Sequence, residues 1–263
     1  DWVLQGYANG QSWDKALDFL RTRLAQATEK ERQGAAQALF AYLLTHDPDQ
    51  EGLLEAALLI PGMGTDLSEN DRIWTWCDSV EYLTQTVLAS RPDQLQRADT
   101  VFWTRSAKER GDKSKSFKRQ AREELVALWK EVMAKEPRLA EWANLERIYL
   151  DMSLHPVALV ASVKKLWDEH KQGLLADAGS LEMRRARRIS DAMQYLAATG
   201  RLSQADVTNL VADLASMAHK PGEEEAQWQY AQLLTLLEKD ETLAKELTRL
   251  ASLPGSSYRW KVR

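Results

Sequence analysis

The segment Leu125-Val-Ala-Leu128-Trp129-Lys-Glu-Val132 carries apolar residues three or four positions apart. That spacing matches the 3.6-residue turn of an α-helix, so these side chains share one helical face. The same spacing recurs at Ala16, Leu17, Leu20, Leu24 and Ala27, and again at Leu210, Val211, Leu214 and Met217. No stretch shows a convincing two-residue alternation of the kind that marks a half-buried β-strand. The sequence therefore predicts an all-α protein.

The breaks between the apolar stripes are short. Glycine (12 residues) and proline (7 residues) are scarce in the 263-residue chain, which disfavours long loops and hairpin-rich β architecture. Residues 61–67 are expected to form a loop, Ser68 and Ser203 to cap helices, and Gly200 to end one. Sequential helices with short connections pack as antiparallel neighbours. We therefore expect about a dozen helices of about 10 to 20 residues, stacked as antiparallel hairpins in an α-solenoid.

Three prolines mark a candidate repeat. Pro48, Pro92 and Pro137 are separated by 44 and 45 residues, and each follows an apolar helix end. Proline is favoured in the first turn of a helix, so each is expected to open the next one. Periods of 20 to 50 residues are typical of helical repeats, although three positions can also arise by coincidence.

One segment resembles a known repeat family. Trp142-Ala-Asn-Leu145-Glu146-Arg-Ile-Tyr149 is similar to the first helix of a tetratricopeptide repeat, which has the pattern W-x2-L-G-x2-Y. Glu146 stands where the family has glycine. Ala158 falls at the small position of the second helix, and Ser162 stands where an aromatic residue is expected.

Two further segments resemble the second helix of that motif, Trp13-Asp-Lys-Ala16-Leu17-Asp-Phe19-Leu20 and Gly200-Arg-Leu202-Ser-Gln-Ala205. Asn209 departs from the pattern. The matches cover about a fifth of the chain and do not keep the family's 34-residue spacing. The resemblance implies a tetratricopeptide-like superhelix whose concave face binds a peptide or protein segment.

A basic stretch at 105–122 is a candidate binding site for an acidic partner or a phosphate backbone. Its eight cationic residues face only two acids, Glu109 and Asp112, a net charge of +6. The cationic residues are Arg105, Lys108, Arg110, Lys113, Lys115, Lys118, Arg119 and Arg122. Gly111 and the serines suggest an exposed loop, and a merely solvated loop is the alternative. We expect one helical-repeat domain over 1–263, with a possible subdivision into 1–110 and 115–263 at this loop.

A second cationic cluster contains Arg184, Arg185, Arg187 and Arg188. On a helix, Arg188 shares a face with Arg184 and with Arg185. The cluster is either a solvated helix face or a partner for acids at 223–225 from a neighbouring hairpin. It is also a candidate partner-binding surface, and it would form a composite cationic surface if it lay beside 105–122.

The sequence offers no recognisable reaction centre. Cys77 is the only cysteine, so neither a disulfide within the chain nor a cysteine zinc site is expected, and its apolar surroundings predict a buried thiol. Three of the four histidines, His46, His155 and His219, lie within two residues of a proline at expected helix junctions. Metalloprotease, phosphate-loop, dinucleotide and nucleophile-elbow patterns are absent. We expect no catalytic residue, no cofactor and no metal ligand.

Six of the ten tryptophans are assigned to two groups. Trp74, Trp103, Trp129 and Trp167 lie within amphipathic stripes and are expected in the core. Trp2 and Trp260 lie near the termini and are the better candidates for a contact surface.

The leading functional prediction is a non-enzymatic scaffold that binds a protein or peptide partner or a neighbouring domain. A nucleic-acid-associated protein is the second hypothesis, although a net charge of −4 disfavours general nucleic-acid binding. An all-α enzyme comes third. No apolar stretch approaches a membrane span, and no signal-peptide pattern appears. The cytoplasm is slightly favoured, and an exported mature chain is the alternative because residue 1 is Asp rather than Met.

Overall fold

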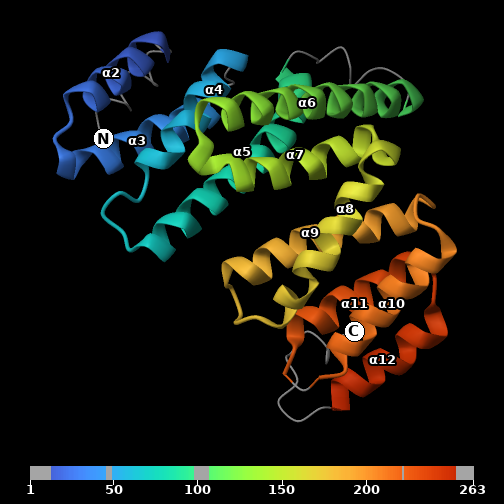
Figure 1. Cartoon of the computed structure of the whole chain (residues 1–263). Coiled ribbons are helices and arrows are strands. Elements are labelled where there is room, and N and C mark those ends of the chain that lie inside the picture. The colour runs from blue at the N-terminus through green and yellow to red at the C-terminus, as the bar shows by residue number, and fades with distance from the viewer. Residues whose placement is uncertain (1–12, 46–48, 98–106, 221, 253–263) are drawn as a thin grey trace. The chain divides into compact units, whose positions relative to one another are not determined.

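The computed structural model describes residues 13–45, 49–97, 107–220 and 222–252, and within them all side chains except those of 13, 45, 89–97, 107–118, 250 and 251 (Figure 1). These residues form eleven α-helices and, in the described ranges, no β-strand. The predicted all-α class is therefore confirmed. The chain divides into two compact units, Asp1–Leu154 and His155–Arg263, each of which is described by itself.

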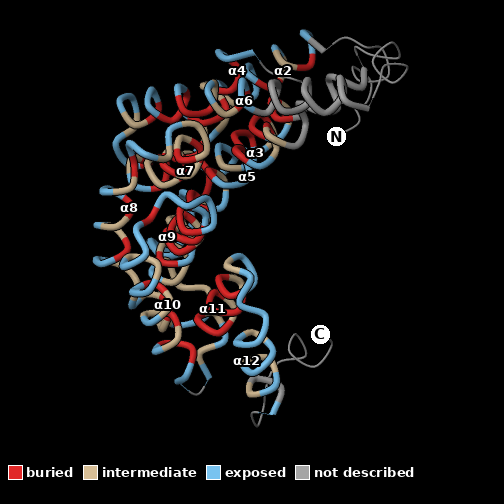
Figure 2. The backbone as a smooth tube through the Cα atoms, turned by 90° about the vertical axis from the view of Figure 1, so that its right-hand side faces the viewer, coloured by how far each residue is buried: buried red, intermediate tan, exposed pale blue. Residues whose placement is uncertain are grey.

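The first unit holds six described α-helices and two 3-10 turns. They are α2 (Trp13–Gln26), α3 (Glu29–Thr45), α4 (Gln50–Leu59), η1 (Ile60–Gly62), α5 (Glu69–Arg97), α6 (Ala107–Lys135), η3 (Pro137–Leu139) and α7 (Ala140–Leu154). Helices α2, α3, α5 and α6 each pack against the next helix in the chain, and α4 packs against α3 and α6. Buried residues follow the sides of the helices that face their neighbours (Figure 2).

The stripe that predicted the fold forms the centre of the first unit. Leu125, Leu128, Trp129 and Val132 on α6 are all completely buried. The Nε1–H of Trp129 donates a hydrogen bond to Thr84 Oγ1 on α5, at 3.1 Å. Because a buried indole N–H needs an acceptor, this bond satisfies the one polar atom that the tryptophan brings into the core.

The second unit holds five α-helices and one 3-10 segment among the described residues. They are α8 (Pro156–His170), η4 (Lys171–Leu175), α9 (Leu181–Ala198), α10 (Gln204–Ala218), α11 (Glu224–Leu236) and α12 (Asp240–Ser252). The predicted stripe on α10 is buried at Leu210, Leu214 and Met217. Helix α12 is drawn mostly in the exposed colour in Figure 2, and none of its described residues is buried.

Several sequence signals at helix ends are confirmed. Ser68 Oγ accepts from the Asp71 N–H at 3.3 Å, and Ser203 Oγ accepts from the Asp206 N–H at 3.1 Å. Gly200 ends α9 with a φ of 66°, a left-handed conformation that glycine adopts without strain. Gly200 N–H and Arg201 N–H donate back to carbonyls of the last turn of α9.

The tryptophan prediction is confirmed at two of the three described positions. Trp129 and Trp167 are buried, whereas Trp74 is half-buried. Trp103 lies outside the described residues, as do Trp2 and Trp260. Cys77 is buried, as its apolar context predicted.

The proline prediction is wrong at one position. Pro137 does open η3, which leads into α7, and Pro48 lies outside the described residues. Pro92, in contrast, lies inside α5, which continues to Arg97. Proline inside a helix removes one N–H donor and crowds the carbonyl four positions earlier, at a cost of about 3 kcal/mol. The Leu, Ala, Gln and Arg residues on both sides of Pro92 are good helix formers and favour the continuous helix.

The basic stretch is not a loop from residue 107 onward. Helix α6 begins at Ala107 and includes Gly111, so α5 and α6 each reach 29 residues, longer than expected. A single glycine costs roughly 1 kcal/mol in a helix, which the surrounding Lys, Arg, Glu and Ala residues offset. Positions 110 and 115 therefore lie within a continuous helix, and the division between compact units falls after Leu154 instead.

Candidate interaction sites

From residue 107 onward the basic stretch is helical, so residues three, four or seven positions apart share a face of α6. Lys108, Lys115, Arg119 and Arg122 follow one another at intervals of seven, four and three positions. On α6 this spacing places the four backbone positions along one side of the helix, and the side chains at 108 and 115 lie outside those described. Arg119 is exposed and pairs with Glu123 one turn later, at 3.0 Å, and Arg122 is half-buried. Arg105 lies outside the described residues.

The arginine cluster at 184–188 lies on α9 and is paired rather than free. Arg187 Nε lies 3.8 Å from Glu225 Oε1 on α11, so of the two alternatives this residue shows the pairing with an acid at 223–225. Arg184, Arg185 and Arg188 also have interaction partners. An ion pair at the surface contributes about 1 kcal/mol at most, so Arg187 stabilises the α9–α11 contact only slightly.

A buried chain of polar groups lies between α9 and α11. Ser190, Gln194 and Gln229 are each no more than 1% exposed. Gln194 Nε2 donates to Gln229 Oε1 at 2.5 Å, and Ser190 Oγ donates to the same oxygen at 2.7 Å. Gln229 Nε2 donates in turn to Glu225 Oε1 at 3.1 Å. The sequence gave no signal for this chain, because polar residues in an amphipathic helix are normally assigned to the surface.

Asp191 lies at the edge of that chain and accepts from Gln229 Nε2 at 3.4 Å. Burial raises the pKa of Asp191, because desolvation disfavours the charged carboxylate, and the charges of Arg187 and Arg188 oppose the shift only in part. Gln194 Oε1 is buried and accepts no hydrogen bond from the part of the chain that the structure describes. An unsatisfied buried acceptor costs about 1–3 kcal/mol.

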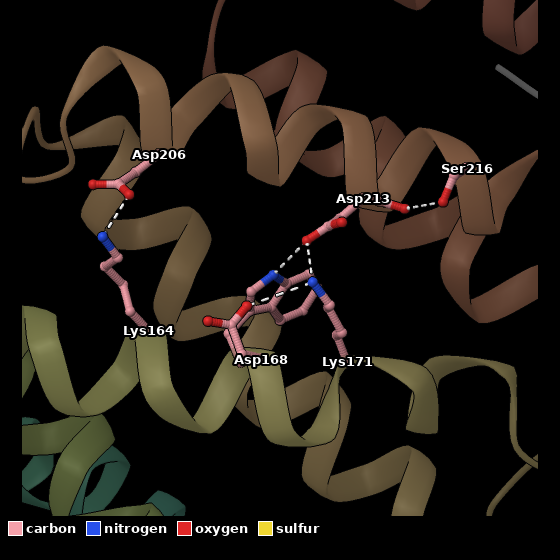
Figure 3. A network of polar contacts seen from close by, with 7 residues as sticks. Lys164, Asp168, Lys171, Asp206, Asp213 and Ser216 are labelled. Atoms are coloured by element: carbon pink, nitrogen blue, oxygen red, sulfur yellow. Dashed lines mark hydrogen bonds and ion pairs between the residues drawn. The ribbon is translucent and has the colours of Figure 1, made fainter.

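Two lysine–aspartate bridges join α8 and the residue that follows it, Lys171 of η4, to α10 (Figure 3). Lys164 Nζ lies 2.5 Å from Asp206 Oδ1, and Lys171 Nζ lies 2.8 Å from Asp213 Oδ2. The Nε1–H of Trp167 donates to the same Asp213 oxygen at 3.1 Å. Hydrogen bonds from Lys164, and then from Ser203, lower the pKa of Asp206. The hydrogen bond to Asp213 raises the pKa of Lys171.

Within the second unit, polar side chains connect α12 to α10. His219 Nε2, at the C-terminal end of α10, lies 2.9 Å from Glu246 Oε1 on α12. Arg249 Nε donates to the other Glu246 oxygen at 2.8 Å. Burial acts to raise the pKa of Glu246, but the hydrogen bonds from His219 and Arg249 outweigh it and the pKa is lowered.

An arginine–tryptophan cluster lies at the start of α5. The guanidinium carbon of Arg72 lies 5.6 Å from the centroid of the Trp76 ring, and that of Arg138 lies 5.9 Å from it. The Nε1–H of Trp76 donates to the Met63 carbonyl at 3.3 Å, which holds the indole in place. A guanidinium over a tryptophan face contributes from about 0.5 to 2 kcal/mol, depending on its desolvation. Arg138 lies in η3, 62 positions from Trp76 in the sequence, so no local sequence pattern predicts this cluster.

Two cavities are lined by described residues. One, of about 500 Å³, lies along α5 beside Asp78, Ser79, Glu81, Tyr82 and Gln85. Tyr82 is 56% exposed there, and its ring centroid lies 6.4 Å from that of Phe40. Another cavity, of about 360 Å³, lies between α2 and α3, with Phe19, Arg23 and Glu31 among its lining residues.

Within the described ranges, no three His, Cys, Asp or Glu side chains come together in a way that could hold a metal ion. His46 lies outside those ranges, and His219 is engaged by Glu246. The described helices include none that is both long and apolar enough to cross a membrane.

These observations define an all-α protein in which ion pairs link neighbouring helices and two arginines approach one buried tryptophan. Comparison with protein-family models, with curated proteins and with solved structures found no match to the chain.

Proposed function

We propose that this protein is a non-enzymatic scaffold that binds a protein or peptide partner, or a neighbouring domain, along the outer surfaces of repeated helical hairpins. Helical-repeat proteins present extended surfaces for this purpose, and they need no reaction centre.

The geometry of the two bridges between α8 and α10 carries the proposal. Both bridges join residues 42 positions apart, Lys164 to Asp206 and Lys171 to Asp213. The two aspartates lie seven positions apart on α10, close to two helical turns, and the two lysines lie seven positions apart on α8 and at its C-cap, Lys171. Equal offsets at both bridges require α8 and α10 to run in the same direction. Equivalent helices of successive hairpins have this relationship, with α9 as the returning helix between them.

The tetratricopeptide-like segment at 142–149 agrees with this proposal at some positions. It lies within α7, and Trp142 and Glu146 are buried there. Ala158, at the small position of the second helix, is exposed on α8. Membership of that repeat family remains a proposal.

Photocrosslinking from an exposed aromatic position tests the scaffold function. The full chain would carry p-benzoylphenylalanine at Tyr82 in one bait and at Tyr195, which is 36% exposed on α9, in a second. We expect a defined partner protein to crosslink to one bait and to be displaced by excess unlabelled chain. The proposal is overturned if no displaceable partner crosslinks to either bait and the purified chain turns over a substrate.

A nucleic-acid-associated role is the second candidate, favoured by the helical backbone of the basic stretch. Four of its cations, Lys108, Lys115, Arg119 and Arg122, occupy one side of α6 over 14 positions, which corresponds to about 21 Å of helix. Phosphate contacts from such a row would make binding strongly dependent on salt.

Charge reversal tests the second candidate. Replacing Lys115, Lys118 and Arg119 by Glu is expected to abolish oligonucleotide binding and its salt dependence. The matched control replaces the exposed Lys15, Lys30 and Arg32 by Glu, which changes the net charge equally on α2 and α3. If the two triple variants bind an oligonucleotide with equal affinity, the basic stretch 105–122 does not bind nucleic acid.

A further inference from the structure

The cluster at the start of α5 combines two cations with one aromatic ring. Arg72 and Trp76 lie four positions apart on α5, so they share a helix face, and Arg138 approaches the same ring from η3. Trp76 itself is only 8% exposed, and its N–H is already used by the Met63 carbonyl. The ring therefore serves as a fixed surface on which the two guanidinium groups rest.

The two arginines differ in how their charge is balanced. Arg138 is neutralised by Glu136, whose two carboxylate oxygens accept from Arg138 Nε at 2.7 Å and from Nη2 at 2.6 Å. Arg72 forms no salt bridge with any residue that the structure describes. Its Nε–H is buried and has no hydrogen-bond partner among the described residues. The nearby carboxylate of Asp71 accepts instead from Ser68 Oγ at 2.6 Å.

An exposed apolar side chain lies close to this cluster. Leu67, in the turn before α5, is 41% exposed. Both Leu67 and Thr75 approach Gly64, which has a φ of +90° and would bring a Cβ to within 3.2 Å of Leu67 Cδ1. Gly64 thus lies between Leu67 and Thr75. Because Thr75 lies three positions after Arg72, it shares a helix face with Arg72, so the turn places Leu67 on the side of α5 that carries Arg72.

We infer that Arg72, supported by Trp76 and flanked by Leu67, binds an acidic peptide segment of a partner protein. A carboxylate of that segment pairs with Arg72, and an aliphatic neighbour of the carboxylate packs on Leu67. This inference rests on the proposed scaffold function and names the chemistry of the partner.

The local charge favours a carboxylate over a nucleic acid. The site offers one cation without a salt-bridge partner, and the planar guanidinium matches the two oxygens of a carboxylate. Glu69 and Asp71, which are exposed on the first turn of α5, would repel a chain of phosphates. A single carboxylate avoids most of this repulsion because it needs only Arg72.

Selection from a displayed library of random 12-residue peptides tests the inference. The purified full chain, the Arg72→Gln variant and an Arg32→Gln control would be screened in parallel. Arg32 is exposed on α3, so its replacement removes the same charge elsewhere in the first unit. Thermal unfolding by circular dichroism would confirm that both variants remain folded.

We expect the unmodified chain and Arg32→Gln to enrich peptides in which Asp or Glu lies within three positions of Leu, Ile or Val. The best peptide should bind Arg72→Gln at least about tenfold more weakly, as measured by fluorescence anisotropy. Changing the peptide's acid to its amide should weaken binding to the unmodified chain by a similar factor. The same change should have little further effect on Arg72→Gln.

The inference is overturned if Arg72→Gln enriches the same peptides, if the enriched peptides lack an acid, or if nothing is enriched. The inference is also overturned if a single-stranded oligonucleotide binds the unmodified chain more tightly than the best peptide does, and if Arg72→Gln weakens that oligonucleotide binding. A partner that crosslinks equally to the unmodified chain and to Arg72→Gln would leave the scaffold function standing while removing this site.

Discussion

Among single residues, Thr84 in the first unit carries a buried hydroxyl whose hydrogen bonds are expected to stabilise the core. Thr84 is 1% exposed, accepts from Trp129 Nε1 at 3.1 Å and donates to the Val80 carbonyl at 3.1 Å. Thr84→Val keeps the shape of the side chain but leaves the buried indole N–H without an acceptor. We expect the free energy of unfolding to fall by about 1–3 kcal/mol, as measured by urea denaturation.

Thr208→Val is the matched control for this substitution. Thr208 is exposed and makes the same type of hydrogen bond to a backbone carbonyl, that of Gln204, but receives none from an indole. Its replacement should change the free energy of unfolding by less than about 0.5 kcal/mol. Equal effects of the two substitutions would mean that the bond from Trp129 does not stabilise the core.

Gly173 is required for the close approach of η4 to α9. A Cβ at this position would lie 2.5 Å from the Glu182 carbonyl oxygen and 3.0 Å from Ala186 Cβ. Gly173→Ala should therefore force the two elements apart and lower the free energy of unfolding by about 1–3 kcal/mol. Gly34→Ala, within α3, meets nothing within 4 Å and should be neutral or stabilise by up to about 1 kcal/mol. Thermal unfolding of both variants measures the contrast, and a Gly173→Ala variant as stable as Gly34→Ala would contradict it.

At the scale of elements, the bridge from α8 to α10 should make stability depend on pH. Hydrogen bonds from Lys164 and Ser203 lower the pKa of Asp206 from its ordinary value of 3.8. Because the pKa is lower in the folded state, the carboxylate stabilises the fold above that value. This stabilisation is lost as the pH falls through the lowered pKa.

Asp206→Asn should remove this contribution. Above pH 5 the variant should melt at a lower temperature than the unmodified chain, and the difference should shrink as the pH falls from 4 to 2. Asp66→Asn, at an exposed aspartate in the turn before α5, is the control. A melting-temperature difference for Asp206→Asn that stays constant from pH 7 to pH 2 would show that the bridge to Lys164 does not contribute.

The same elements show what a sequence can and cannot predict. The apolar spacing within 125–132 correctly predicted which face of α6 is buried, because helical periodicity is a local property of the sequence and the apolar face of a helix packs into the core. Ser68, Ser203 and Gly200 predicted helix ends for the same reason, since caps are local hydrogen bonds. The predictions of a helix start at Pro92 and of a loop around Gly111 were wrong, because a single unfavourable residue does not end a helix when its neighbours favour one.

The candidate sites depend on long-range packing, which explains why the sequence missed them. Arg72 and Arg138 meet at Trp76 only because η3 packs near the start of α5. Gln194 and Gln229 come together only when α9 and α11 are in contact. The cationic residues at 105–122 and 184–188 were found from composition, yet the acid opposite Arg187 became certain only with the contact between α9 and α11.

At the scale of the whole molecule, the two compact units each have a core of their own. In the second unit, Trp167, Leu196, Leu214 and Leu233 are buried on four different helices. The buried chain Ser190–Gln194–Gln229 and the two bridges of α8 to α10 also lie entirely within this unit. A unit with its own apolar core and its own polar contacts has what independent folding requires.

We therefore predict that residues 155–263, expressed alone, fold into a helical unit. Its far-ultraviolet circular dichroism should show high helix content, and it should unfold cooperatively in urea. Introducing Gly173→Ala should lower its urea midpoint by about as much as it lowers the midpoint of that unit in the full chain. Thr84→Val, which changes the other unit, should leave the second unit's transition in the full chain unmoved. If 155–263 alone shows no cooperative unfolding, or if Thr84→Val shifts both transitions equally, the two units fold as one.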